Sequence, residues 1–316
     1  MEVRYVMHQK CLQDVRYHLS YLSESIRLGQ PALFTEYVKW LKQTLPQYGI
    51  PIKNLIVNFG CIEDELKKRL DSASYEVVKE YLEEAVSELS KSDYITGPEE
   101  TGLNELAERY LTLLLNNDRY NASKLVLDAV EGGICVKDIY MDVFQESQKR
   151  LGVLWHLNKI SVAQEHYCTA ATQLIMSQLY PKIFSTGKNG KRAVFASIAG
   201  ELHEIGARMV ADFFEMDGWD SHYLGANTPV QSIISFIENV KPHMIGISVT
   251  MSFNLASAEQ LIAKIRSQAG GDIVILLGGY PFNNIPDLWK SIGADACSGN
   301  ALDALITADR LLIKER

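Results

Sequence analysis

The sequence predicts a multidomain protein of α and α/β structure: an N-terminal helical bundle, a four-helix bundle and a five-stranded doubly wound parallel sheet. Three observations predict this order. Helical spacing of apolar residues runs through the first 184 of 316 residues. A polar stretch around Gly97-Pro98 interrupts it. Short apolar runs then alternate with helical segments. The expected domains span residues 1–92, 102–184 and 190–316.

Composition places the chain among ordinary globular proteins. Hydrophobic residues make up 47% and charged residues 22%. The apolar runs are far shorter than a membrane span, and the first ten residues lack the pattern of a signal peptide. We therefore expect a cytoplasmic protein with no membrane attachment. Five cysteines are scattered singly without a CxxC pair, which argues against a zinc site and favours reduced thiols.

The first domain is expected to hold four helices with short joints that contain Gly or Pro. Pro31 and Pro51 stand where helices begin, and Ser72 or Ser74 is the expected cap of the last helix. Short joints favour an antiparallel bundle. The expected helices span residues 6–28, 32–48, 51–70 and 72–89.

The charge of this domain argues against direct DNA binding. Residues 1–95 carry 12 Lys and Arg against 14 Asp and Glu, and no helix has a basic stripe. A bundle without such a stripe is more typical of protein interaction or dimerisation. We expect it to contact a protein partner or to form a homo-oligomer.

The second domain is expected to be another four-helix unit. Ser161 with Gln164 three residues later is the pattern of a capping box at the start of its last helix. The expected helices span residues 103–115, 121–130, 136–155 and 161–184.

Strands and helices alternate in the third domain. The expected strands are residues 192–198, 219–224, 244–249, 273–277 and 294–297. The expected helices are about 204–217, 229–240, 255–268, 284–291 and 300–312. No Gly-x-Gly-x-x-Gly follows the first strand and no Walker A lysine motif occurs, which argues against a dinucleotide or P-loop nucleotide site.

A histidine lies in the loop between the first strand and the first helix of this domain. It belongs to the pattern Glu201-x-His203-x-x-Gly206. In parallel sheets, ligands bind in the crevice beyond the carboxyl ends of the strands. A neutral imidazole there can bind a metal, and Glu201 could orient or polarise it. Alone, this short pattern is weak evidence.

Two other strand ends carry residues suited to a ligand. Ser248 and Thr250 follow the third strand, and Gly278 and Gly279 follow the fourth. Hydroxyls supply hydrogen bonds, and glycines let a ligand approach the backbone. Each residue alone has an ordinary explanation, such as a cap or a turn. At one edge of one sheet, together with His203, they predict a ligand cleft.

These loops resemble those of the cobalamin-binding domain family, which has a flavodoxin-like fold. The resemblance implies a cobalamin cofactor in which His203 is the lower axial ligand of cobalt. It implies that Ser248, Thr250, Gly278 and Gly279 line the displaced nucleotide tail, which Gly206 lets pass. Methionine synthases and methyl carriers usually have Asp at the position of Glu201 and Leu at that of Thr250.

A second pattern, Trp155-His156 followed by Glu165-His166, resembles the Trp-x9-Glu-His signature of light-sensing, adenosylcobalamin-dependent regulators of the CarH type. The resemblance covers residues 100–316 and leaves out the first domain, which in those regulators is a MerR-like DNA-binding head. It implies that Trp155 covers the upper face of the corrin and that Glu165 and His166 contact the adenosyl group. His156 would bind cobalt once light breaks the Co–C bond.

These patterns favour a non-catalytic photoreceptor or sensor that binds adenosylcobalamin, or methylcobalamin, and signals to a protein partner. One alternative is a corrinoid protein that carries methyl groups between methyltransferases. A carrier needs an open upper face, which a Trp155 cap would cover. A light-independent cobalamin sensor is the other alternative. The remaining residues are too few for the substrate barrel of a full mutase or methyltransferase.

Overall fold

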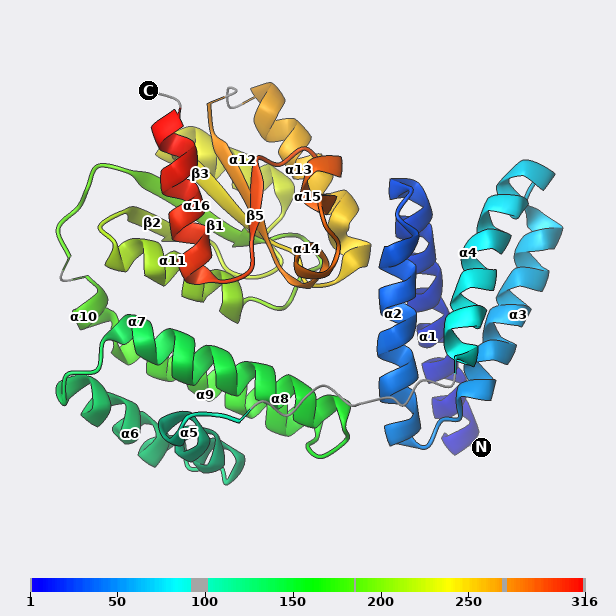
Figure 1. Ribbon diagram of the computed structural model, residues 1–316, viewed down its shortest axis with the longest axis horizontal. Helices are drawn as coiled ribbons and strands as arrows, with labels where there is room; N and C mark the ends of the chain where they lie inside the picture. Colours follow the sequence, from blue (N-terminus) through cyan, green and yellow to red (C-terminus); the bar gives the residue numbers. More distant parts are fainter. Residues whose placement is uncertain (1, 92–101, 185, 269–271, 315–316) are drawn as a thin grey trace. The chain divides into compact units, whose positions relative to one another are not determined.

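A computed structural model of the chain describes residues 2–91, 102–184, 186–268 and 272–314. It divides into two compact units, Met1–Gly97 and Pro98–Arg316 (Figure 1). Within the described residues, no helix is long and apolar enough to cross a membrane.

The first unit is a bundle of four helices, in which α2 packs on α1 and α4, and α3 packs on α4. Its helices are α1 (Glu2–Leu28), α2 (Pro31–Thr44), α3 (Ile52–Arg69) and α4 (Ser72–Ser90), with a 3-10 turn at Leu45–Tyr48. The expected serine cap of α4 is wrong. Asp71 caps this helix instead, because its carboxylate accepts hydrogen bonds from the backbone N–H groups of Ala73 and Ser74.

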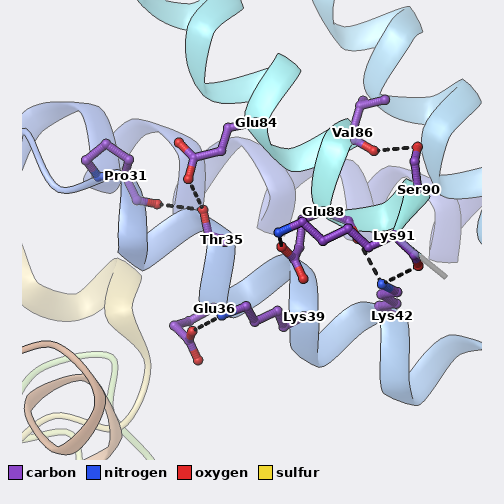
Figure 2. Close-up of polar contacts among 10 residues, drawn as sticks. All are labelled: Pro31, Thr35, Glu36, Lys39, Lys42, Glu84, Val86, Glu88, Ser90 and Lys91. Carbon is purple, nitrogen blue, oxygen red and sulfur yellow. Dashed lines mark hydrogen bonds and ion pairs between the residues drawn. The ribbon is translucent and has the colours of Figure 1, made fainter. Parts of the chain in front are cut away.

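The last turn of α4 is held by a buried lysine of α2. The ammonium group of Lys42 donates to the carbonyl oxygens of Glu88 and Lys91, at 2.9 Å each (Figure 2). A cation is favourable there because carbonyl groups at a helix end lack intrahelical partners and carry partial negative charge. Thr35 of α2 also donates to the Glu84 carboxylate of α4, at 3.1 Å. These contacts fix α4 against α2.

The second unit begins with a group of helices that we call the cap. They are α5 (Glu105–Leu115), α6 (Arg119–Glu131), α7 (Val136–Asp138), the π-helical segment η2 (Ile139–Gln145), α8 (Glu146–His156), α9 (Val162–Gln178) and α10 (Tyr180–Ile183). The capping box at Ser161 and Gln164 is confirmed. The single helix expected over residues 136–155 instead contains η2. The wider turns of this segment interrupt the α-helix while Ile139, Tyr140, Val143 and Phe144 stay buried.

A five-stranded sheet follows the cap, and the expected doubly wound parallel arrangement is confirmed. The strands are β1 (Arg192–Ser197), β2 (Asp220–Tyr223), β3 (Met244–Ser248), β4 (Val274–Gly278) and β5 (Ala296–Ser298). They pair in the order β2-β1-β3-β4-β5, all parallel, which is the flavodoxin-like order. Ser197 pairs with Ser248, and Ser248 pairs with Gly278, so the ends of three strands lie in one row.

Helices pack on the sheet at both faces. They are α11 (Ile205–Met216), α12 (Val230–Val240), α13 (Leu255–Gln268), α14 (Tyr280–Asn284), α15 (Leu288–Ser291) and α16 (Ala301–Lys314), with a 3-10 turn at Ser252–Asn254. Helix α11 packs on α16 at one face, and α12 packs on α13. The helix expected over 284–291 is wrong. Pro286 lacks an N–H and Asp287 has φ +59°, so the chain forms two short helices there.

The cap is attached to α11 by a buried carboxylate. Asp212 accepts hydrogen bonds from the hydroxyls of Tyr140 at 2.7 Å and Tyr180 at 3.0 Å, which come from η2 and α10. Met209 and Phe213 of α11 also belong to the apolar core of the cap. Helix α11 therefore packs against the sheet and the cap together, and it follows directly from the loop that carries His203.

Candidate functional site

The loop from β1 to α11 places His203 beside a fully buried carboxylate. Oε1 of Glu201 lies 2.5 Å from Nδ1 of His203 and 3.1 Å from its backbone nitrogen. Oε2 of Glu201 accepts from the backbone N–H groups of Thr250 at 2.8 Å and Met251 at 2.9 Å. Glu201 therefore ties the histidine loop to the loop after β3.

The charges of this pair decide which imidazole nitrogen is free. Burial favours a higher pKa for Glu201, but hydrogen bonds from His203, Met251 and Thr250 outweigh it and lower the pKa to about 2. The hydrogen bond to Glu201 raises the pKa of His203 against the opposing effect of burial. Because an ionised carboxylate only accepts, Nδ1 carries the proton that faces it. In the neutral imidazole, Nε2 then keeps its lone pair for a metal.

His203 lies at a cavity of about 310 Å³ that extends along the sheet. Its side chain is 59% exposed, whereas Glu201 has no exposed surface. The walls come from β1, β3, β4, α11 and the first turn of α16, with Phe195, Met209, Leu276 and Ala301 among the apolar residues. Five other residues predicted from the sequence also line the cavity: Gly206, Ser248, Thr250, Gly278 and Gly279.

Gly279 is required by the backbone at this edge. Its φ is +117°, and a Cβ there would lie 1.9 Å from the carbonyl oxygen of Val249. The N–H of Val249 donates to the carbonyl of Gly278 at 2.9 Å, which holds the two loops together. At Gly206, by contrast, a Cβ would meet no atom within 4 Å. The space at Gly206 is open for a ligand.

The other predicted residues stand apart from this cavity. Trp155 and His156 end α8 with their rings 5.1 Å apart, and burial lowers the pKa of His156. His166 is 73% exposed, and its Nε2 lies 3.5 Å from the Glu165 carboxylate. None of these four residues is among those that line the cavity. Glu165 is nevertheless near enough for its charge to contribute to the raised pKa of His203.

Three residues of the cap that the sequence analysis did not select line the cavity instead: Gln145, Gln148 and Lys149. The Thr169 hydroxyl lies 2.8 Å from oxygens of both Gln148 and Glu165, which links this wall to Glu165. The signal in the sequence was their spacing, 145, 148 and 149, which places polar side chains on one face of a helix. Ser298, Asn300 and Asn283 at the β5 side of the sheet were also missed.

The residues present fit a cobalt corrinoid. They offer one imidazole nitrogen with its partner nitrogen already engaged, a long apolar cavity beside it, and a glycine loop where any Cβ would collide with backbone. One protein ligand suffices for such a metal, because the macrocycle supplies the equatorial nitrogens.

Comparison with protein families gives two matches in the second unit. Residues 191–308 and residues 106–180 each match a model described as a B12 binding domain. The second unit therefore contains two segments that are similar to B12 binding domains. Residues 4–89 match a third model, described as phycobilisome protein.

Curated relatives are named as corrinoid proteins. The dimethylamine corrinoid protein of Methanosarcina barkeri is 26% identical over 200 residues, which is 56% of this chain and 92% of that protein. Dimethylamine corrinoid protein 1 of Methanosarcina acetivorans is 24% identical over 217 residues, covering 66% and 97%. The solved monomethylamine corrinoid protein of Methanosarcina barkeri superposes with a TM-score of 0.57 at 20% identity, covering 67% and 99%, and shares the fold.

The cobalamin cofactor predicted from the sequence is confirmed by these matches. The closeness to CarH-type regulators stays a prediction, as do the roles of the individual site residues. The relatives agree better with the corrinoid-protein alternative than with the photoreceptor.

Proposed function

We propose that the protein is a corrinoid protein that carries a methyl group between methyltransferase partners. Two curated relatives, aligned over 92% and 97% of their own length, are named dimethylamine corrinoid proteins. The observation that carries the proposal is the pairing of His203 with buried Glu201 at the mouth of an apolar cavity. Bound cobalamin supplies a cobalt that accepts and releases methyl groups.

On this proposal, the chain's own residues hold and orient the cofactor. Nε2 of His203 would hold the cobalt, while Glu201 keeps the proton on Nδ1 and fixes the plane of the ring. Ser248, Thr250, Gly278 and Gly279 would line the nucleotide tail, and Gly206 would leave room for it, among the other cavity residues.

The names of the relatives favour the carrier over the light sensor. A carrier needs an upper face that partner enzymes can reach. The cap residues that line the cavity beside His203 are the polar side chains of Gln145, Gln148 and Lys149. The chemistry of methyl transfer would then belong to partner enzymes. We propose the first unit as the surface that contacts a protein partner.

A light-dependent sensor remains the second candidate. The side-by-side rings of Trp155 and His156 favour it, as does the effect of the Glu165 charge on His203. On that candidate, His156 would take the upper position after photolysis of adenosylcobalamin.

Absorption spectra of the loaded protein separate the two. For the carrier, methylcobalamin-loaded protein loses its methyl-form spectrum in the dark only when a corrinoid methyltransferase and its acceptor are added. His203→Ala should remove the protein-ligated spectrum. For the sensor, green light should produce a stable shifted spectrum of adenosylcobalamin-loaded protein that His156→Ala abolishes. A chain that binds no corrin contradicts both.

A further inference from the structure

The carboxylate of Glu204, the residue after His203, joins three segments of the second unit. Its Oε1 accepts a hydrogen bond from the Gln173 amide of cap helix α9, at 2.9 Å. Its Oε2 accepts from the Tyr223 hydroxyl and the Ala226 N–H, each at 3.1 Å, at the end of β2. Because Glu204 follows His203 directly, contacts that fix the Glu204 side chain also restrain the backbone on the C-terminal side of His203.

Glu201 holds the N-terminal side of the same histidine without touching the cap. Its hydrogen-bond partners are His203 itself, the backbone of Thr250 and Met251, and the Asn254 amide. All of these belong to the α/β part of the unit. Of the two carboxylates that flank His203, Glu204 is the one that accepts from a cap residue.

Other polar contacts of the cap reach α11 rather than the histidine loop. Arg208 donates to the Ser177 hydroxyl at 2.7 Å, and Asp212 accepts from Tyr140 and Tyr180. Separation of the cap from α11 would break these contacts one or more helical turns beyond His203. Separation of the cap at Gln173 would instead remove one of the three hydrogen bonds that the carboxylate of Glu204, the neighbour of His203, accepts.

We propose that Glu204 is a positioning residue that couples docking of the cap to the orientation of the His203 imidazole under cobalt. This inference rests on the proposed function, in which His203 is the lower ligand. With Gln173 in place, both carboxylate oxygens of Glu204 are bonded and the loop is held between α9 and β2. Without Gln173, Oε1 turns to water and the β2 contacts alone hold the loop.

Three single variants separate this coupling from general loosening of the cap. Gln173→Leu removes the cap donor and leaves Tyr223 and Ala226 in place. Glu204→Gln keeps the shape but turns an NH2 group toward one set of donors, so one contact must be lost. Ser177→Ala is the matched control, because it removes a cap contact of similar length that reaches Arg208 and not Glu204.

The measurement is the electron paramagnetic resonance spectrum of full-length protein loaded with cob(II)alamin. The protein carries 15N-labelled histidine, so the nitrogen splitting of the cobalt lines distinguishes imidazole from the 14N base of the cofactor and reports the fraction with imidazole bound. Loss of the Gln173 hydrogen bond predicts a fall in the bound-to-free ratio of roughly 3-fold for Gln173→Leu. In Glu204→Gln the amide oxygen faces the two donors at β2, so the Gln173 contact is lost and the other two weaken with the loss of charge, which predicts a fall of about 10-fold. Ser177→Ala should leave the ratio unchanged, and the Glu204→Gln/Gln173→Leu double variant should match Glu204→Gln alone.

A readout without cofactor completes the test. Hydrogen exchange at the backbone amides of residues 201–205 should be faster in Gln173→Leu than in Ser177→Ala. Equal changes in these two variants, or an unchanged imidazole ratio in Glu204→Gln, would overturn the coupling. Wild-type protein that binds cob(II)alamin without the 15N splitting gives a different result. It would overturn the lower-ligand role of His203 in the proposed function, and the coupling with it.

Discussion

Two histidines, one in each unit, occupy opposite environments. His18 of α1 is 5% exposed, shares a hydrogen bond of 2.8 Å with the Tyr37 hydroxyl, and lies edge-on to Phe59. Burial lowers its pKa to about 4. His203 is 59% exposed, and its ionised partner Glu201 raises its pKa. The same side chain is a neutral core residue in one unit and a polarised, accessible base in the other.

The difference shows what makes a histidine available for metal binding. A hydroxyl partner and aromatic neighbours satisfy His18 but leave its ring enclosed. A buried carboxylate engages one nitrogen of His203 and leaves the other accessible. The hydrogen-bond partner of each histidine distinguishes the two sites. Substitutions of these partners therefore test the difference most directly.

Removal of the carboxylate should have the largest effect. Glu201→Ala leaves the N–H groups of Thr250 and Met251, the Asn254 amide and His203 without their acceptor. Each unpaired buried donor costs about 1–3 kcal/mol, so we expect the second unit to lose more than about 3 kcal/mol. Hydrogen exchange of the β1 and β3 amides would measure it. Glu201→Gln, which keeps one acceptor oxygen, should lose less. A loss below about 1 kcal/mol for Glu201→Ala would contradict the central role of Glu201.

Acid should have the second-largest effect, a loss of stability in the first unit. Because the pKa of His18 is about 4 when folded and 6.5 when unfolded, the unfolded chain takes up the proton first. Stability is therefore complete above pH 6.5 and falls as the pH drops toward 4, by up to about 3 kcal/mol. Hydrogen exchange of α1 and α2 amides against pH would show it. In His18→Phe, this part of the acid dependence should disappear; if it persists, another group is responsible.

Lys42 is another buried side chain of the first unit, and backbone carbonyls rather than a carboxylate hold its ammonium group. Lys42→Met keeps most of the apolar stem and removes both hydrogen bonds to Glu88 and Lys91. We expect the first unit to lose about 2 kcal/mol, since hydrogen bonds from a charged donor exceed neutral ones. Faster exchange in the last turn of α4, with α3 unchanged, would locate the effect. Lys39→Met, which removes an exposed pair with Glu36, is the control and should cost well under about 1 kcal/mol.

The smallest effect is expected at the partner of His18. Tyr37→Phe removes one neutral hydrogen bond while the ring stays stacked on Tyr21, at 3.8 Å between centroids. The expected loss is about 1 kcal/mol in urea unfolding followed by a probe in the first unit. A loss as large as that of Glu201→Ala would remove the contrast between the two histidines.

The fold and the lower side of the site could largely be predicted from the sequence. Short apolar runs between helical segments predicted all five strands, and parallel strands bring Ser248 and Gly278 to one edge beside the histidine loop. The pairing of Glu201 with His203 is local, two residues apart, so a short pattern contained it. Local sequence patterns and the order of the strands together were sufficient to predict the lower side of the site.

The cap side could not be predicted in the same way. Which residues of α8 face the cavity depends on the rotation of the helix, and we expected a regular helical period from Val136 onward. The wider turns of η2 interrupt that period, and Gln145, Gln148 and Lys149, which were not expected at the site, line the cavity. Gln173 and Glu204 are 31 residues apart and meet only when α9 packs on the loop. No short motif contains such a pair.

The wide turn at Ile139–Gln145 also has a consequence for how this chain can change over time. Each residue of an α-helix advances about 100° around its axis. Loss of a single residue within η2 would restore the regular period and rotate the whole of α8 by about that angle. Gln148 and Lys149 would leave the cavity together while every side chain stayed the same. In this part of the chain, a one-residue deletion is a greater change than many substitutions, and relatives of equal length here are the ones in which the facing residues can be compared position by position.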